Sequence, residues 1–301
     1  MNKKNGLAGS LLILLAGVLW GSIGVFVKEL NRVGATGEVT NFLRQTSAFV
    51  LMIPICLLKG GIRSFKVSGR TLLSCMVFGV ICHGMTNICY TAAVNTIGMS
   101  SSVVLLYLAP VFTMVFSILF FKEKMSAKKI IAVFINILGC VLTVTNGVFD
   151  FKTLAIVGVL FGIGSGFCYG LAPIVWRFTK EGENPYVVNL YSFLFAAIFL
   201  GLWMKPWQGG IVIDGKMVFW GVLFGLVATA IAYTVYYMGL QIITESSRVP
   251  VIASIEVVVA TLFGIFLYSE GIGPAGICGI VLVLASIAIM NLKKKSNTSF
   301  D

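Results

Sequence analysis

The sequence has few charged residues, one histidine and no cysteine pair with metal-binding spacing. Charged side chains make up only 11% of the 301 residues, whereas a soluble domain carries about a quarter. Hydrophobic residues reach 58%, and the mean hydropathy is +1.00. This composition excludes a soluble core with a polar coat, so we expect the chain to lie in a membrane.

The seven cysteines do not indicate a metal or redox site. No Cys-x-x-Cys motif occurs, and all seven cysteines fall inside apolar stretches. Cys75, Cys82 and Cys89 share one helix face, and we expect them to be small buried hydrophobic residues. Pro-rich and Ser-rich linkers are also missing, so we expect one integral membrane domain. We expect neither a metal ion nor another cofactor.

The net charge of +11 does not indicate a nucleic-acid partner. Lys and Arg lie in the short links between apolar segments, where they determine membrane topology. If the N-terminus is cytoplasmic, most of the 22 Lys and Arg lie on the cytoplasmic side. We therefore expect a multi-pass plasma-membrane protein, surrounded by lipid, with both termini in the cytoplasm. The outer links would hold only Lys28, Arg32, Lys152, Lys205 and Lys216.

Apolar segments long enough to cross a bilayer fill nearly the whole chain, and each crossing takes about 20 residues. We expect the first to be retained as a span rather than cleaved as a signal peptide, because its apolar run is long and further spans follow. The fold class is therefore an all-α membrane protein with ten transmembrane helices. They are expected at residues 7–27, 38–58, 71–92, 99–121, 128–146, 153–176, 185–204, 216–240, 246–268 and 272–291.

The second half of the chain repeats the first. Residues 87–123 align with residues 234–270 at a shift of 147 positions, and both stretches end in a glutamate, Glu123 and Glu270. Identity is low, but hydropathy, a very short link and the final glutamate recur. A repeat of this length indicates a duplicated membrane unit.

The duplication predicts two repeats of opposite orientation. Each repeat contains five spans, and an odd number of crossings inverts the second repeat relative to the first. We place the first five-helix repeat at residues 1–147 and the second at residues 148–301, within one membrane domain.

Spans three and eight carry matching polar and aromatic stripes. His83, Asn87 and Tyr90 share one helix face, and Tyr233 and Tyr237 lie on the equivalent face of span eight. Such a stripe is costly against lipid, so we expect both to line a cavity inside the bundle. The alternative is hydrogen bonding between helices without a ligand. His83 is either a proton carrier or a structural histidine.

Glu256 lies near the middle of span nine with apolar neighbours on every side. A desolvated carboxyl group there is a candidate for binding an ammonium group or exchanging a proton, or it is a neutral group hydrogen-bonded between helices. Arg44 in span two either extends to the membrane surface or faces the cavity, where it would pair with Glu256 or a substrate carboxylate. Trp20 and Tyr169, aligned at a shift of 149, line the cavity or fill the core.

Pro110 and Pro173 lie inside spans and are candidate hinges, because each removes a backbone donor. No enzyme and no catalytic residue are expected. The glycine-rich stretch at residues 162–166 lies in an apolar helix without a preceding strand, and Ser165 lacks the setting of a protease nucleophile. Small residues at helical spacing let span six approach its neighbours closely. They are Gly158, Gly162, Gly166 and Gly170.

These features, in this order, resemble EamA-type proteins of the drug/metabolite transporter superfamily. The stretches that carry the resemblance are LLAGVLWGSIGVFVK in span one, FLRQTSAFVL in span two, YTAAVNTIGMSSSVVLLYLAP in spans three and four, and YYMGLQIITESSRVPVIASIEVVVATLFG in spans eight and nine. The resemblance covers nearly the whole chain. It implies a plasma-membrane secondary carrier that works by alternating access, with a central cavity lined by spans one to four and six to nine.

The resemblance also bears on single residues. It matches Glu256 to the acidic residue that precedes the usual proline of span nine. In this chain Val257 replaces that proline, which speaks against a hinge at this position, whereas span four keeps Pro110.

The sequence thus predicts a secondary transporter for a small polar metabolite, an amino acid or an amine, in the export direction. Glu256 would be the central charge, with the proton as a candidate coupling ion. The alternative is a non-transporting membrane scaffold or a multidrug-type binding protein with a dry, closed interior. The sequence leaves the oligomeric state open.

Overall fold

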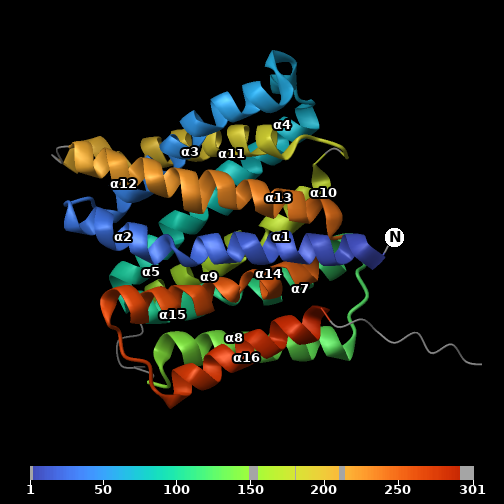
Figure 1. The fold of residues 1–301 in the computed structure, drawn as a ribbon, viewed down its shortest axis with the longest axis vertical. Helices are drawn as coiled ribbons and strands as arrows, with labels where there is room; N and C mark the ends of the chain where they lie inside the picture. Colours follow the sequence, from blue (N-terminus) through green and yellow to red (C-terminus); the bar gives the residue numbers. More distant parts are fainter. Residues whose placement is uncertain (1–2, 149–154, 180, 210–213, 292–301) are drawn as a thin grey trace, which may run out of the picture.

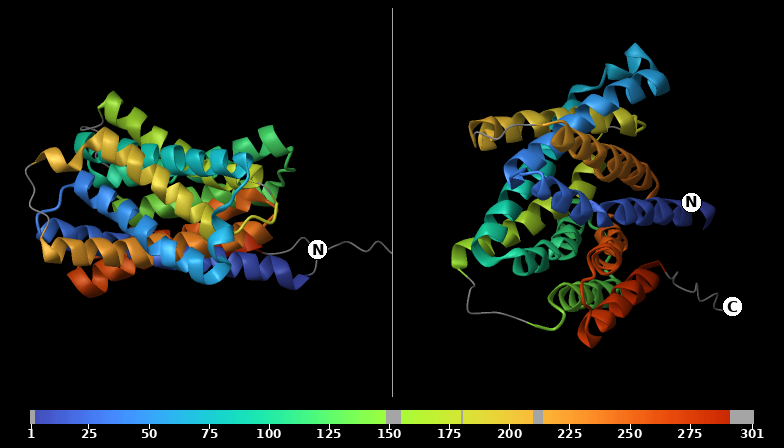
Figure 2. Two further views of the ribbon diagram at one scale, coloured as in Figure 1. Left: turned by 90° about the horizontal axis from the view of Figure 1, so that it is seen from above. Right: turned by 60° about the vertical axis from the view of Figure 1, so that its left-hand side comes forward.

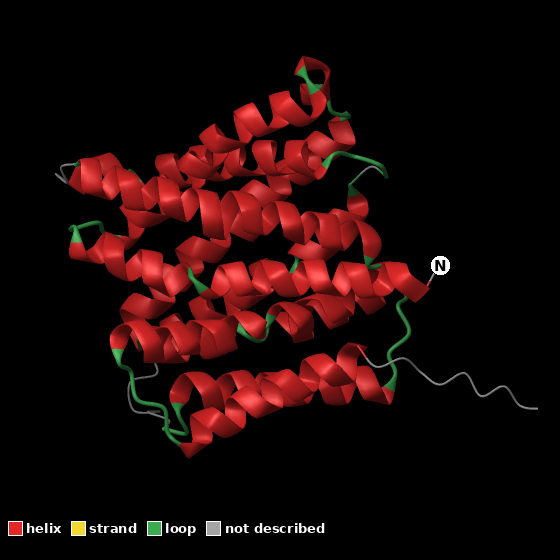
Figure 3. Ribbon diagram, viewed as in Figure 1, coloured by secondary structure: helices red, strands yellow, loops and turns green. Residues whose placement is uncertain are grey.

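The computed structural model describes residues 3–148, 155–179, 181–209 and 214–291. Within them every regular element is a helix (Figure 3). Ten helical stretches are long and apolar enough to cross a membrane, so the prediction of an all-α protein with ten spans is confirmed. They are Leu7–Arg32, Gly37–Gly60, Gly69–Ile97, Met99–Phe121, Ala127–Thr145, Ile156–Phe178, Pro185–Met204, Gly215–Ile242, Ser246–Tyr268 and Pro274–Asn291.

Several spans consist of two or three consecutive helical segments. In chain order the elements are α1 (Lys3–Gly21), α2 (Ile23–Arg32), α3 (Gly37–Gly60), η1 (Ile62–Phe65), α4 (Gly69–Val77), η2 (Phe78–Met85), α5 (Thr86–Ile97), α6 (Met99–Leu106), α7 (Ala109–Phe121), α8 (Ala127–Thr145), α9 (Ile156–Gly170), α10 (Ala172–Phe178), α11 (Pro185–Met204), η3 (Pro206–Gly209), α12 (Gly215–Gly225), η4 (Leu226–Ile231), α13 (Ala232–Ile242), η5 (Ser246–Arg248), α14 (Val249–Ala253), α15 (Ile255–Tyr268) and α16 (Pro274–Asn291).

The spans run side by side, with α1 near the middle of the bundle (Figure 1). We call the side on which α1 begins the N side, and the other the far side. Helices α10, α13 and α14 lie in the N-side half, and α2, α5 and α15 lie in the far half. Helices α8 and α16 pack along one another at one edge of the bundle (Figures 1 and 2). Spans five and ten therefore lie away from the centre.

Helix interruptions recur at equivalent positions of the two repeats. Span one is broken at Ser22 and span six at Leu171, which are 149 positions apart. Span four is broken at residues 107–108 and span nine at Ser254, at the shift of 147. A π-helical stretch also widens spans three and eight, as η2 and η4. The backbone thus repeats more clearly than the sequence does.

In each equivalent pair, one break is made by a proline and the other by a serine. Pro110 and Pro173 lie in the first turn of α7 and α10, where the missing N–H leaves no helix bond to the preceding segment. At the equivalent breaks, the hydroxyls of Ser22 and Ser254 donate to carbonyls three residues earlier, at 2.6 and 2.7 Å. These bonds satisfy carbonyls at the interruption.

Span nine is interrupted at Ser254, three residues before Val257. The expectation that Val257 is not a hinge stays a prediction. Asn136 of α8 donates to the Ser254 hydroxyl at 2.5 Å and to the Ser286 hydroxyl of α16 at 2.9 Å. The break is therefore held by a hydrogen bond to span five, whose Asn136 is also bonded to span ten, rather than by a proline.

Glycines bring spans one and six against these breaks. A Cβ atom on Gly17 would lie 2.6 Å from the carbonyl oxygen of Ala253, just before the break in span nine. A Cβ atom on the equivalent Gly166 would lie 2.7 Å from the carbonyl oxygen of Leu105, just before the break in span four. The same close backbone contact therefore occurs in both repeats, as small residues permit.

The buried apolar core is concentrated in the N-side half. Its largest cluster joins side chains of α1, α3, α4, α10, α11, α13 and α14. A separate cluster in the far half joins α2, α3 and α12. Among the described residues, no buried side chain of α5 or α6 belongs to any core cluster. The two halves of the bundle are thus packed differently.

The contact between α8 and α16 makes a prediction for stability. A Cβ atom on Gly279 would lie 2.5 Å from the backbone nitrogen of Thr143 and 2.7 Å from the carbonyl oxygen of Gly139. We expect Gly279→Ala to lower the free energy of unfolding by about 1–3 kcal/mol, as overpacking does. Gly24→Ala is the control, because a Cβ atom there meets nothing within 4 Å. Equal thermal stability of the two purified variants would contradict the prediction.

Candidate functional site

Trp20 lies at the centre of a group of aromatic side chains. Its side chain is only 3% exposed, and its ring centroid lies 4.9 Å from that of Tyr233, 5.0 Å from that of Tyr236 and 6.4 Å from that of Tyr169. These residues come from spans one, six and eight. The Trp20 ring nitrogen is buried and has no hydrogen-bond partner among the described residues. A donor is therefore available in the middle of the bundle.

His83 lies against the same group. It sits in the π-helical stretch η2, and its ring centroid is 4.6 Å from that of Tyr233 and 5.7 Å from that of Phe193. The side chain is 2% exposed, and Nε2 has no hydrogen-bond partner within the described part of the chain. π-Helical stretches often mark functional positions in helices. His83 and Tyr233, which the sequence places on matching stripes, are brought together.

Arg44 points into the bundle rather than to the membrane surface. Its side chain is 8% exposed, its Nε donates to the Thr229 hydroxyl at 2.9 Å, and its guanidinium lies 4.8 Å from the centroid of the Phe224 ring. The Tyr233 hydroxyl lies beside it. Among the described residues, no carboxylate oxygen lies within 4.0 Å of the Arg44 guanidinium. Its positive charge thus lacks a directly bonded counter-charge.

Glu256 lies in the first turn of α15, two residues after the break at Ser254. The side chains of Tyr107, Tyr90 and Tyr169 are electrostatic neighbours of its carboxylate. The positive end of the helix dipole favours a carboxylate at this position. Glu256 is half-buried although it lies in mid-span, so part of its surface remains accessible.

Three of the predicted site residues have other surroundings. Asn87 donates its side-chain amide to the carbonyl oxygen of His83 in its own span, at 2.6 Å. Tyr90 is half-buried and belongs to the surroundings of Glu256. Tyr237 is fully buried, with ring centroids 5.0 Å from both Trp176 and Phe78. Tyr237 is therefore part of the N-side core and lies apart from the surroundings of Glu256.

Three side chains of the site were missed by the sequence reasoning. Tyr107 immediately precedes the break in span four, so Pro110 three residues later was an available signal. Tyr236 was overlooked because it lies beside Tyr233 rather than at helical spacing from it. Thr229 lies in η4, a widened stretch that has no simple sequence signature. We call Trp20, Arg44, His83, Tyr107, Tyr169, Tyr233, Tyr236 and Glu256 the central cluster.

The approach to the central cluster differs between the two sides. On the N side, α13 packs against α10 and α11, and α7 packs against η5 and α14. The equivalent far-side contacts would join α5 to α2 and α3, and α15 to α6. On the far side, α5 meets α3 through a hydrogen bond from the Asn41 side chain to the Thr91 hydroxyl at 3.5 Å. Among the described residues, all three far-side pairs pack less closely than their N-side equivalents. The central cluster is thus closed off toward the N side and less closely covered toward the far side.

Two other features of the structure do not belong to this cluster. No group of three His, Cys, Asp or Glu side chains in the described ranges could hold a metal ion. A surface hollow of about 460 Å³ lies on the far side, and no residue of the central cluster lines it. Its lining residues are Gly34, Thr36, Glu38, Met204, Lys205, Pro206 and Gln208.

Comparison with known proteins gives a family model that matches both halves of the chain. The EamA-like transporter family matches residues 7–145 and again residues 156–292. The two matches correspond to the two five-span repeats. Our boundary between residues 147 and 148 falls between them and stays a prediction.

Similar proteins cover almost the full chain. An uncharacterized transporter of Archaeoglobus fulgidus is 28% identical over 93% of this chain and 95% of its own length. The pseudopaline exporter CntI of Pseudomonas aeruginosa is 23% identical over 95% of this chain and 97% of its own length. A solved crystal structure with 16% identity has a TM-score of 0.79 and covers 94% of this chain and 97% of its own, which shows the shared fold.

The unequal packing of the two sides predicts which cysteines will react with a thiol reagent. Tyr90 and Tyr237 are equivalent residues, but Tyr90 is half-buried on the far side and Tyr237 is fully buried on the N side. In a background without the seven native cysteines, we expect Tyr90→Cys to react with a hydrophilic maleimide and Tyr237→Cys to stay protected. Mass spectrometry of the purified protein measures both rates. Equal rates would show that the far side is as closed as the N side.

Proposed function

Because the chain belongs to the EamA-like transporter family, we propose that it is a secondary transporter for a small polar metabolite. The substrate class is an amino acid or an amine, carried from the cytoplasm outward. Glu256 is the observation that carries this proposal. It is a half-buried carboxylate in mid-span, beside a helix break, in a cluster that is less closely covered on one side.

The central cluster offers opposite charges at two places. Glu256 provides a negative charge for a substrate ammonium group, and Arg44 provides a positive charge without a bonded carboxylate. The aromatic rings of Trp20 and Tyr169 lie among these charges and can cover an apolar or cationic part of a substrate. Both charges lie inside the bundle, where a dielectric constant below that of water strengthens electrostatic contacts.

Alternating access fits the packing difference between the two sides. In this conformation the N side is closed and the far side is less covered, as in a carrier that faces the far side. Because Lys and Arg are concentrated in the links expected on the N side, we assign that side to the cytoplasm. The described conformation would then be the one that releases an exported substrate. The similarity to an exporter supports the same direction.

Proton coupling would run through Glu256. A carboxylate with part of its surface accessible can bind either a proton or a substrate ammonium group, and the two would compete. His83 has no free path of its own in this conformation, because it is 2% exposed and lies between Tyr233 and Phe193. We therefore assign the coupling role to Glu256 and a positioning role to His83.

We expect Glu256→Gln to abolish transport, because the amide keeps the size of the side chain but carries no charge. The assay is uptake of radiolabelled leucine and of its decarboxylated amine into proteoliposomes across a series of external pH values. Glu181→Gln is the matched control, since Glu181 is exposed in the link after span six. Transport by Glu256→Gln equal to that of the control would remove Glu256 from the mechanism. Transport of neither compound by the unchanged protein would favour the non-transporting alternative for these substrates.

The proposed role of Arg44 predicts that its substitution affects the transport of leucine more than the transport of the decarboxylated amine. If its guanidinium binds a substrate carboxylate, Arg44→Gln should reduce leucine transport by about tenfold or more, because a desolvated charge pair is lost. Transport of the amine, which has no carboxylate, should fall much less. Arg44→Lys keeps the charge and should retain part of the leucine transport. An equal loss for both compounds would assign Arg44 a structural role.

A further inference from the structure

Glu123 and Glu270 end equivalent helices in the same way. Each follows a residue in the left-handed region, Lys122 with φ 50° and Ser269 with φ 54°. The backbone N–H of Glu123 donates to the carbonyl oxygen of Ser117, and that of Glu270 donates to the equivalent carbonyl of Gly264, both at 3.1 Å. This arrangement closes a helix C-terminus. It places one glutamate at the N-side end of α7 and the other at the far-side end of α15.

A basic residue lies beside each of these helix ends. Lys28 lies 3.8 Å from the ring centroid of Tyr268, and Arg177 lies 3.8 Å from the ring centroid of Phe121. Lys28 and Arg177 are equivalent at the shift of 149, and Tyr268 and Phe121 are equivalent at the shift of 147. The contact between a basic side chain and an aromatic ring is therefore present at the equivalent helix end of both repeats.

The two glutamates nevertheless differ in their surroundings. The Glu123 side chain is 8% exposed, accepts a hydrogen bond from Ser247 and forms an ion pair with Lys129 at 2.9 Å. The Glu270 side chain is 54% exposed and pairs with Lys28. The residue equivalent to Ser247 is Ser100, at the start of span four, and it is exposed. The bond between glutamate and serine is thus present on the N side alone.

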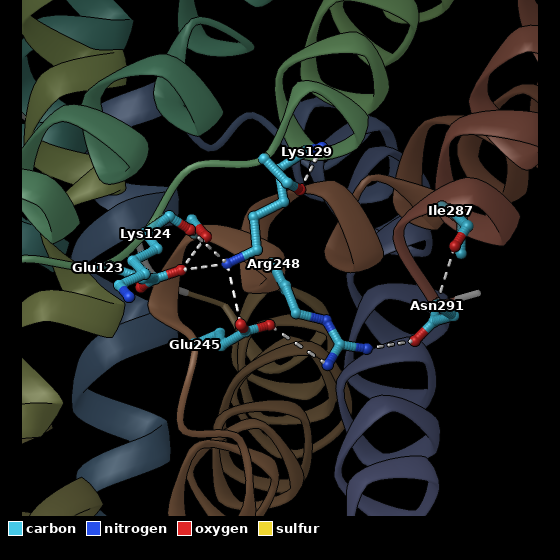
Figure 4. A network of polar contacts seen from close by, with 9 residues as sticks. Glu123, Lys124, Lys129, Glu245, Arg248, Ile287 and Asn291 are labelled. Atoms are coloured by element: carbon cyan, nitrogen blue, oxygen red, sulfur yellow. Dashed lines mark hydrogen bonds and ion pairs between the residues drawn. The ribbon is translucent and has the colours of Figure 1, made fainter. Parts of the chain in front are cut away.

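A network of charges surrounds the bond on the N side (Figure 4). Lys129 also contacts Glu245 at 3.0 Å, and Arg248 contacts Glu245 at 3.7 Å and the Asn291 side chain at 3.1 Å. The network therefore ties together the N-side ends of spans four, five, eight, nine and ten. Its far-side counterparts include Gly98 and Gly276, which carry no side chain for an ion pair. The serine bond is the one part of the N-side network that the far side has the residues to repeat.

We propose that the transporter exchanges these two bonds when it changes the side it faces. The Glu123–Ser247 bond holds α7 against η5 and closes the N side. When the N side opens, this bond breaks, α15 moves against α6, and Glu270 leaves Lys28 to accept a hydrogen bond from Ser100. The proposal rests on the alternating access proposed above. In this proposal, the conformation closed on the N side has the Glu123–Ser247 bond, and the conformation closed on the far side has the Glu270–Ser100 bond. The two bonds therefore never form at the same time.

The experiment measures the exposure of each side through a single cysteine in the background without native cysteines. Tyr90→Cys reports on the far side and Tyr237→Cys on the N side. Ser247→Ala removes one bond, Ser100→Ala removes the other, and Ser101→Ala is the control. The readout is the rate of modification by a hydrophilic maleimide in purified protein, where both sides are open to the reagent.

We expect Ser247→Ala to speed the modification of Tyr237→Cys and to slow that of Tyr90→Cys. Loss of a hydrogen bond to a charged group changes a two-state ratio by about tenfold. The double variant Ser247→Ala/Ser100→Ala should return both rates toward those of the unchanged protein, because both states have then lost their bond. A merely destabilised protein would not show this return.

Three results would overturn the exchange. The first is that Ser247→Ala leaves both modification rates unchanged, and the second is that it speeds both. The third is that adding Ser100→Ala to Ser247→Ala changes the rates no more than adding the control Ser101→Ala does. Modification needs no substrate, so the exchange is measured separately from transport. If the rates shift as expected but neither leucine nor its amine is transported, the exchange stands and the proposed substrate class falls.

Discussion

A lipid bilayer offers no hydrogen bond to a peptide group, so every interrupted helix in this protein must satisfy its own backbone. Span one, span four, span six and span nine are all broken near the middle of the bundle. Proline removes the donor that would be left unpaired, and serine supplies a donor for a carbonyl that would be left without one. Proline thus deals with the unpaired backbone donor, and serine with the unpaired backbone acceptor. The central cluster is possible because these breaks bring helix ends, with their exposed dipoles, to the interior.

The charged side chains of Glu256 and Arg44 must likewise be stabilised within the protein, because the lipid offers them no polar partner. Glu256 lies at the start of α15, where the helix dipole compensates part of its charge, and the Tyr107 side chain is an electrostatic neighbour. Arg44 is held by the Thr229 hydroxyl and by the face of Phe224. Each charge is thus stabilised by dipoles and rings rather than by direct pairing with the other. Direct pairing would leave nothing for a ligand to bind, whereas two separately supported charges remain available.

The ten spans and the inverted repeat could be predicted because hydropathy accumulates over about 20 residues and tolerates local errors. The interior position of Glu256 followed from the same averaging, since a carboxylate cannot face lipid cheaply. Finer placement could not be predicted where the backbone departs from an ideal helix, and the cavity-lining role of the stripe stays a prediction. The stripe through His83 and Asn87 assumed regular α-helical spacing, but η2 inserts a π-helical stretch, and an additional residue rotates the following side chains by about 100°. The break at Ser254 was missed for a related reason. Serine is common within membrane helices, and only its contact with Asn136 distinguishes this position.

A duplicated fold would be symmetric if both repeats kept the same residues, and a carrier could then rest equally well facing either side. Here the differences are local. The pair Ala109 and Pro110 in the first repeat stands where Glu256 and Val257 stand in the second, so the carboxylate beside the break occurs once. The N-side ends carry Lys129, Glu245 and Arg248, whereas the equivalent far-side positions are Gly276, Gly98 and Ser101. The ion pairs of the largely buried Lys129 side chain and the pair of Glu245 with Arg248 stabilise closure on the N side, whereas the far side has the more exposed pair of Lys28 and Glu270 and is easier to open. The conformation described, closed on the N side, therefore follows from the residues that the repeats do not share. The alternating access proposed above would instead use the breaks, caps and glutamates that they do share.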